Sequence, residues 1–215
     1  MTTQKTYHHG DLKNALIQAG IQLLTEEGVN GLSLRKVAHL AGVTHSAPYA
    51  HFKDKQALLA AISTDGYEKV YQLLEQVVTA FPNDPLRQLI EIGWSYVQFG
   101  IKEPDHFKIT FSASVEKERE YPDLVEATAR TFNELRMLIL RCQQAGLIEK
   151  GDPDLAAITL WSLVHGFVGL IHEGMVSHTV TDRFPLRKML ILLLNRVLVH
   201  PITIDPADGS PLVED

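Results

Sequence analysis

Five prolines divide the sequence after residue 84 into segments that each resemble the start of a helix. They are Pro85, Pro104, Pro122, Pro153 and Pro185. Proline is favoured at the first helical position, where an N–H would lack an intrahelical partner in any case. Apolar residues then recur at three- and four-residue spacing, which is typical of a helix packed on one face. The expected helices lie near residues 85–100, 104–111, 122–145, 153–174 and 185–200. Because no strand-like alternation extends beyond a few residues, we expect an all-α fold.

The first eighty residues also follow a helical pattern. One apolar stripe runs from Leu12 to Leu23, and we expect this first helix to end at Gly28. A long helix is expected over residues 54–81, where the run Pro82-Asn83-Asp84-Pro85 should break it. Acidic residues that precede two of the prolines, Asp84 and Asp152, are suited to cap the helices that follow.

Residues 33–52 contain two short helical patterns joined by a glycine. Ser33 can cap the first helix and Thr44 the second, and Gly42 lies where a tight turn needs a positive φ. Pro48 falls in the first turn of the second helix, which we therefore expect to be short. This arrangement can place the second helix in the major groove of DNA. An ordinary helical hairpin is the alternative, and the glycine alone does not separate the two.

The residues around this turn favour contact with DNA. Hydrogen-bond donors and positive charge gather at the end of the second helix, at Tyr49, His51, Lys53 and Lys55. Such side chains can hold phosphate oxygens on either side of a groove. Arg35 and residues 44–46 are candidates for base contact, because Arg can bond two acceptors of one guanine and Thr, His and Ser make single adaptable bonds.

The stretch closely resembles the DNA-binding domain of the TetR/AcrR family of transcriptional regulators. The matching residues are Gly31, Leu32, Arg35, Val37, Ala38, Ala41, Gly42, Val43, Tyr49, Ala50, His51, Phe52, Lys55 and Leu58. A weaker likeness extends to Trp161, His165 and Gly166, which is similar to a C-terminal type named for a Trp-His-Gly signature. The resemblance implies that Arg35, Thr44, His45 and Ser46 contact base edges. It also implies phosphate contacts by Ser33, Tyr49, His51, Lys53 and Lys55.

We accordingly expect a three-helix DNA-binding domain over residues 8–70, a helical ligand-binding and dimerisation domain over 71–200, and a poorly ordered tail over 201–215. The charged residues are also distributed unevenly between the two ends of the chain. The formal net charge is −6, but residues 1–55 carry six Lys and Arg against four Asp and Glu, and they hold five of the ten histidines. Since DNA contact follows local charge, we expect the N-terminal end to face DNA.

A ligand pocket and a dimer interface are predicted in the second domain. Aromatic side chains accompany histidines there, and our candidates for the pocket are Trp94, Phe107, Phe111, Trp161 and His165. Aromatics at helical spacing also form ordinary core, so that alternative stays open. Residues 153–174 and 185–200 are apolar on nearly every side, which favours burial between two copies as a four-helix bundle over a buried helix of a monomer.

Together with the family resemblance, these patterns predict a cytoplasmic homodimer. The resemblance implies that it represses transcription at a palindromic DNA operator and is released by a small molecule. An activator of the same family is the nearest alternative. An all-α enzyme is less favoured, because the sequence has no G-x-S-x-G, H-E-x-x-H or glycine-rich phosphate loop. The single Cys142 excludes an internal disulfide, and the polar N-terminus suggests neither a signal peptide nor a membrane partner. The adjacent His8 and His9 cannot enclose an ion alone, so we expect no metal or cofactor, and a flexible arm near the DNA backbone is favoured there.

Overall fold

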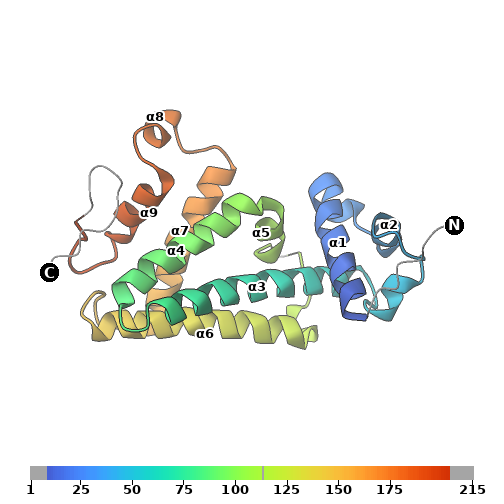
Figure 1. Ribbon diagram of the computed structural model, residues 1–215, viewed down its shortest axis with the longest axis horizontal. Coiled ribbons are helices and arrows are strands. Elements are labelled where there is room, and N and C mark those ends of the chain that lie inside the picture. Colours follow the sequence, from blue (N-terminus) through green and yellow to red (C-terminus); the bar gives the residue numbers. More distant parts are fainter. Residues whose placement is uncertain (1–8, 113, 204–215) are drawn as a thin grey trace. The chain divides into compact units, whose positions relative to one another are not determined.

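The computed structural model describes residues 9–112 and 114–203, and within them the regular elements are all helices (Figure 1). This confirms the all-α prediction. The elements are α1 (His9–Gly31), α2 (Leu34–Leu40), η1 (Ala47–Ala50), α3 (Lys55–Ala80), α4 (Pro85–Lys102), α5 (Pro104–Thr110), η2 (Glu118–Glu120), α6 (Pro122–Gln144), α7 (Pro153–His172), α8 (His178–Thr181) and α9 (Leu186–Leu194).

The chain forms two compact units. The first contains the residues up to 68 together with 105–128, and the second contains 69–104 and the residues from 129 onward. These units are defined by packing within the folded chain. The segment 105–128, which falls within the predicted C-terminal domain, packs within the first compact unit.

The first unit has one apolar core, to which α1, α2, α3 and α5 all contribute. Its fully buried members include Leu16, Val37, Leu58 and Ile62. Helices α1 and α3 approach closely at Gly20, where an added Cβ would lie 2.9 Å from Ile62 Cδ1. Helix α1 breaks at Gly28, which has φ 68° and ψ −177°, so the expected end of the regular first helix is confirmed and one further turn follows it.

The second unit packs α4 against α7 and α9, and α7 against α9. Leu89, Val97, Leu138, Val168 and Leu190 are among its most buried side chains. Helix α7 is long and apolar enough to cross a membrane by length and composition, with mean hydropathy 1.6, although core helices of water-soluble proteins pass the same test.

Local side chains explain several helix ends. The carboxylates of Asp84 and Asp152 accept from the backbone N–H groups of Arg87 and Asp154, at 2.9 and 2.8 Å, which confirms both predicted caps. The last helix is shorter than expected, because it ends at Leu194 rather than near residue 200. The Asn195 side chain bonds both the N–H and the C=O of Ile202 and so holds the chain in a turn. Of the predicted tail, residues 204–215 lie outside the described part of the chain.

Candidate nucleic-acid interface

Helix α2 is closed at both ends by specific hydrogen bonds. The Ser33 hydroxyl accepts from Lys36 N–H at 3.3 Å, which confirms the predicted cap. After the helix, Gly42 has φ 69°, and the N–H groups of Gly42 and Val43 donate to the carbonyls of His39 and Ala38 at 3.1 and 3.0 Å. This pair of bonds is a Schellman motif, which needs a left-handed residue at the glycine position. The turn therefore leads the chain out of α2 in a fixed direction.

The segment after the turn is a short 3₁₀ helix and not an α-helix. Its bonds join residues three apart, as in Tyr49 N–H to Ser46 C=O at 3.2 Å. The predicted cap by Thr44 is wrong: its hydroxyl lies 3.2 Å from Ser46 Oγ, while its carbonyl accepts from Ala47 N–H. Pro48 lies in the first turn, where its missing N–H is compatible with this form. Buried Pro48 and Phe52 anchor the segment to the core.

The four predicted base-contacting residues, Arg35, Thr44, His45 and Ser46, are all exposed. They belong to one continuous stretch, with Arg35 on α2 and the other three in the turn before η1. Together they present a guanidinium, two hydroxyls and an imidazole, which are the donor types that read base edges in the major groove.

The five predicted phosphate contacts differ in exposure. Tyr49 is 61% exposed and Lys53 is also exposed, whereas Ser33, His51 and Lys55 are partly buried. The Ser33 oxygen is used as a cap acceptor, which leaves its O–H to donate. The His51 ring centroid lies 6.2 Å from that of Phe52 and the side chain lines a cavity, so this imidazole is less accessible than that of exposed His45. Of the suggested N-terminal arm, His8 lies outside the described residues, and His9 begins α1.

Lys36 on α2 forms an ion pair with Glu27 of α1. Both side chains are about half exposed, at 50% and 41%, so solvent screens the pair and its contribution to stability is small. The pairing nevertheless removes Lys36 from the positive charges that face outward from this part of the first unit.

The five candidates for a ligand pocket divide between the two units. Phe107 and Phe111 belong to the first, where their rings pack edge to face at 4.9 Å and Phe111 also contacts Tyr67 at 5.3 Å. Trp94, Trp161 and His165 belong to the second. Of the five, Trp161 lines a cavity of about 40 Å³ within the second unit.

A polar network that the sequence did not indicate joins α4 to α7. The Trp161 indole N–H donates to the Tyr96 hydroxyl at 3.1 Å, and this hydroxyl lies 2.8 Å from His165 Nδ1. Burial lowers the pKa of His165 below its usual value, and the nearby His172 lowers it further. Trp94 lies beneath the guanidinium of Arg187, which also pairs with Glu91 at 2.7 Å. Only long-range packing brings these residues together.

Comparisons with known proteins identify both parts of the chain. Residues 16–62 match a family model described as bacterial regulatory proteins, tetR family, and residues 89–192 match one described as the tetracyclin repressor-like C-terminal domain. The HTH-type transcriptional regulator AcrR of Shigella flexneri is 34% identical over 82 residues, which is 38% of each chain. The class A tetracycline repressor protein from transposon 1721 of Escherichia coli is 48% identical over 50 residues, or 23% of each chain.

These two alignments span well under half the length of the relatives they match. A solved structure extends the likeness over nearly the whole chain. It is a protein of unknown function from a Rhodococcus species, which is 27% identical, has a TM-score of 0.73, and is matched over 90% of this chain and 97% of its own.

Proposed function

We propose that this chain, which belongs to the TetR family of bacterial regulatory proteins, is a sequence-specific DNA-binding regulator that acts as a dimeric repressor in the cytoplasm. The observation that carries the proposal is the exposed set Arg35, Thr44, His45 and Ser46, presented around a turn that a Schellman motif and a capped helix hold in place. A rigid backbone around these side chains favours recognition of a DNA sequence, because base contacts need donors held in fixed directions.

Within this proposal Arg35 and the residues of the turn read base edges, while phosphates are held mainly by Tyr49 and Lys53. Both are exposed and both follow the turn directly in the chain. Ser33 and Lys55, which are partly buried, would contribute at the margin of the interface, and His51 would need to reorient. Phosphate contacts position the protein, and base contacts supply its specificity.

A dimer gives two such surfaces and therefore a palindromic operator. Helix α7 carries exposed apolar side chains that favour a dimer. Leu155, Ile158 and Leu170 are 65%, 47% and 47% exposed. On α9, Leu192 is 37% exposed. Exposed apolar side chains on two neighbouring helices are suited to burial against the same helices of a second copy.

We further propose that a small molecule releases the DNA by binding the second unit near Trp94, Trp161 and His165. The cavity of about 40 Å³ beside Trp161 is too small for a drug-sized ligand, so binding there requires α4 and α7 to move apart. Such a ligand selects a different state of the protein, and operator DNA must weaken ligand binding by the same factor. Trp94 and Trp161 are the only two tryptophans, so their fluorescence can report the binding of candidate effectors.

Binding to the DNA upstream of its own coding sequence tests the proposal. We expect the protein to bind that duplex at least about a thousandfold more tightly than a scrambled duplex of equal composition, and to protect a two-fold symmetric sequence in a footprint. Equal affinity for the two duplexes would contradict sequence-specific regulation. Protection of a single half-site by a monomer would contradict the dimer alone.

A further inference from the structure

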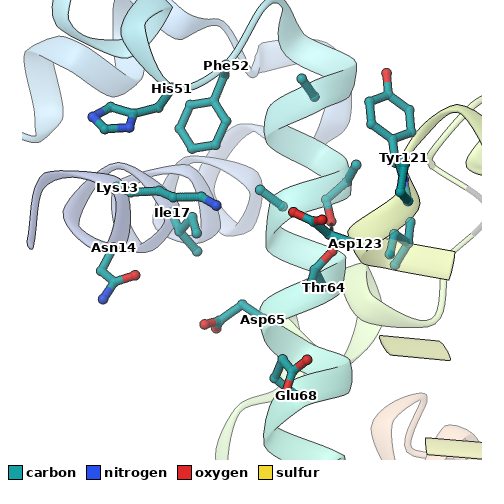
Figure 2. Close-up of a pocket in the computed structure, with 15 residues that line it drawn as sticks. Lys13, Asn14, Ile17, His51, Phe52, Thr64, Asp65, Glu68, Tyr121 and Asp123 are labelled. Atoms are coloured by element: carbon teal, nitrogen blue, oxygen red, sulfur yellow. Dashed lines mark hydrogen bonds between the residues drawn. The ribbon is translucent and has the colours of Figure 1, made fainter. Parts of the chain in front are cut away.

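A cavity of about 340 Å³ lies within the first unit, and none of the residues proposed for the effector lines it (Figure 2). Its walls come from α1, the residues that follow η1, the first half of α3, and the beginning of α6. All of these segments belong to the same compact unit. The volume falls at the lower end of the range of small-molecule sites, which is about 300–1,000 Å³.

The interior wall of the cavity is apolar. Ile17, Phe52 and Leu124 line it and are 5%, 2% and 3% exposed, so each presents a packed apolar surface and not a mobile side chain. Ala57 and Ala61 on α3 also line it, and their small side chains leave the space between α3 and the neighbouring segments open. An apolar ring placed there would exchange water contact for contact with buried side chains.

The charged side chains around this cavity are predominantly acidic. Asp65 and Glu68 on α3 and Asp123 on α6 contribute three carboxylates, whereas Lys13 is the one lysine or arginine in the wall. Asp65 also lies 3.5 Å from the imidazole of buried His106. Partial burial raises the pKa of the Tyr121 hydroxyl, and surrounding carboxylates, led by that of Asp54, raise it further. The carboxylates of Asp54, Glu120 and Glu116 therefore outweigh nearby Lys117 at the Tyr121 hydroxyl.

We propose that this cavity binds a small organic cation with an apolar body, its ring against Ile17 and Phe52 and its charge toward Asp123 and Glu68. An anion of similar size would be repelled by the carboxylates. A small cation without a ring would gain charge attraction but would leave the apolar wall in contact with water. The aromatic faces of Phe52 and Tyr121 add cation–π attraction to the same class of ligand. The site shares His51 with the proposed DNA contacts, but none of the proposed effector residues near Trp161 lines it.

Calorimetric titration of the full-length protein with benzyltrimethylammonium tests the site in the absence of DNA. We expect one binding site per chain and an affinity at least about tenfold higher than for tetramethylammonium or for phenylacetate. Equal binding of the two cations would show that charge alone is responsible and would overturn the site. Equal binding of phenylacetate, or no binding of benzyltrimethylammonium, would overturn it as well.

Two variants locate the binding and one serves as a control. Asp123→Asn removes an exposed carboxylate with almost no change in shape, and we expect it to weaken binding about tenfold. Ala61→Leu fills the cavity and should abolish binding while the helical circular dichroism is retained. Glu26→Gln removes an exposed carboxylate of α1 that is not part of the wall, and it should leave the affinity unchanged. Equal losses in Asp123→Asn and Glu26→Gln would show diffuse attraction to an acidic surface and would refute the proposal.

Discussion

The indole N–H of Trp161 on α7 donates to the hydroxyl of Tyr96 on α4 at 3.1 Å. The same hydroxyl is 2.8 Å from His165 Nδ1, so the Tyr96 oxygen contacts two residues of α7. Because the tryptophan N–H can only donate, the Tyr96 O–H is left to donate to His165, whose Nδ1 must then be unprotonated. Two residues of the Trp-His-Gly signature are therefore tied to α4 in the packing of the second unit.

Replacing Tyr96 with Phe should lower the free energy of unfolding by about 1–3 kcal/mol. The change removes the acceptor of Trp161 and the donor of His165 while it keeps the buried ring, which is 7% exposed in the native protein. Urea denaturation followed by tryptophan fluorescence measures the effect. Tyr49→Phe is the matched control, since its ring is 61% exposed and a surface change of this kind costs less than about 0.5 kcal/mol. Similar losses in the two variants would mean that the hydroxyl network contributes nothing specific.

The same network predicts a dependence of stability on pH. Burial and His172 lower the pKa of His165 in the folded protein below the ordinary value of 6.5. The unfolded chain therefore binds a proton at this imidazole more tightly than the folded protein does. Above pH 6.5 this group does not change the free energy of unfolding. As the pH falls below 6.5 toward the lower pKa of the folded protein, the free energy of unfolding decreases. We expect the urea midpoint to fall between pH 7 and 5 by a larger amount in the wild type than in His165→Gln. An equal fall in both proteins would assign the effect to other groups.

Much of the fold follows from residues that act locally. Helices α4, α5, α6 and α7 begin at the prolines that the sequence marked, and Ser33, Asp84 and Asp152 cap helices as expected, because a cap depends on neighbours within three residues. The end of α9 was not predictable in this way. It depends on bonds between Asn195 and the backbone of Ile202, whose position is set by the packing of the whole second unit.

In the candidate site as well, some features could be predicted from neighbouring residues and others could not. Exposure of Arg35 and the residues before η1 could be anticipated from the apolar spacing of α2. The 3₁₀ form of η1 could not, because Pro48 permits either a short α-helix or this tighter turn. The placement of residues 105–128 depends on a contact distant in sequence: a Cβ on Gly66 would lie 1.8 Å from Thr110 Oγ1, so α5 packs directly on the backbone of α3.

Gly42→Ala should destabilise the protein by about 1–2 kcal/mol through backbone strain alone. Gly42 has φ 69°, yet nothing lies within 4 Å of the position that a Cβ would occupy, so no clash contributes. Gly151→Ala is the control, because the space around it is also open and its φ lies outside the left-handed range. Thermal unfolding of both variants measures the difference. If Gly151→Ala were as destabilising as Gly42→Ala, the left-handed turn would not be the cause.

Arg35→Ala should weaken binding to the operator by about 1–3 kcal/mol and relax the preference for it over scrambled DNA. Lys53→Ala should instead weaken binding to both DNAs by a similar factor and reduce the dependence on salt. Fluorescence anisotropy with both duplexes at two salt concentrations distinguishes these outcomes. Equal losses on the two duplexes for Arg35→Ala would remove this residue from the proposed base contacts.

A charge placed on the exposed apolar face of α7 should separate the proposed dimer. Within the apolar residues 185–200, Leu193 and Val197 are partly buried within one chain, whereas Ile158 on α7 is 47% exposed. In a dimer the carboxylate of Ile158→Glu would be buried without a partner, which costs several kcal/mol per ion. We expect light scattering to show monomers that retain their helical content and lose operator binding. Val125→Glu tests the same substitution at a 39% exposed position of α6 in the first unit and should leave the dimer intact. An Ile158→Glu protein with an unchanged dimer mass would exclude this face of α7 from the interface.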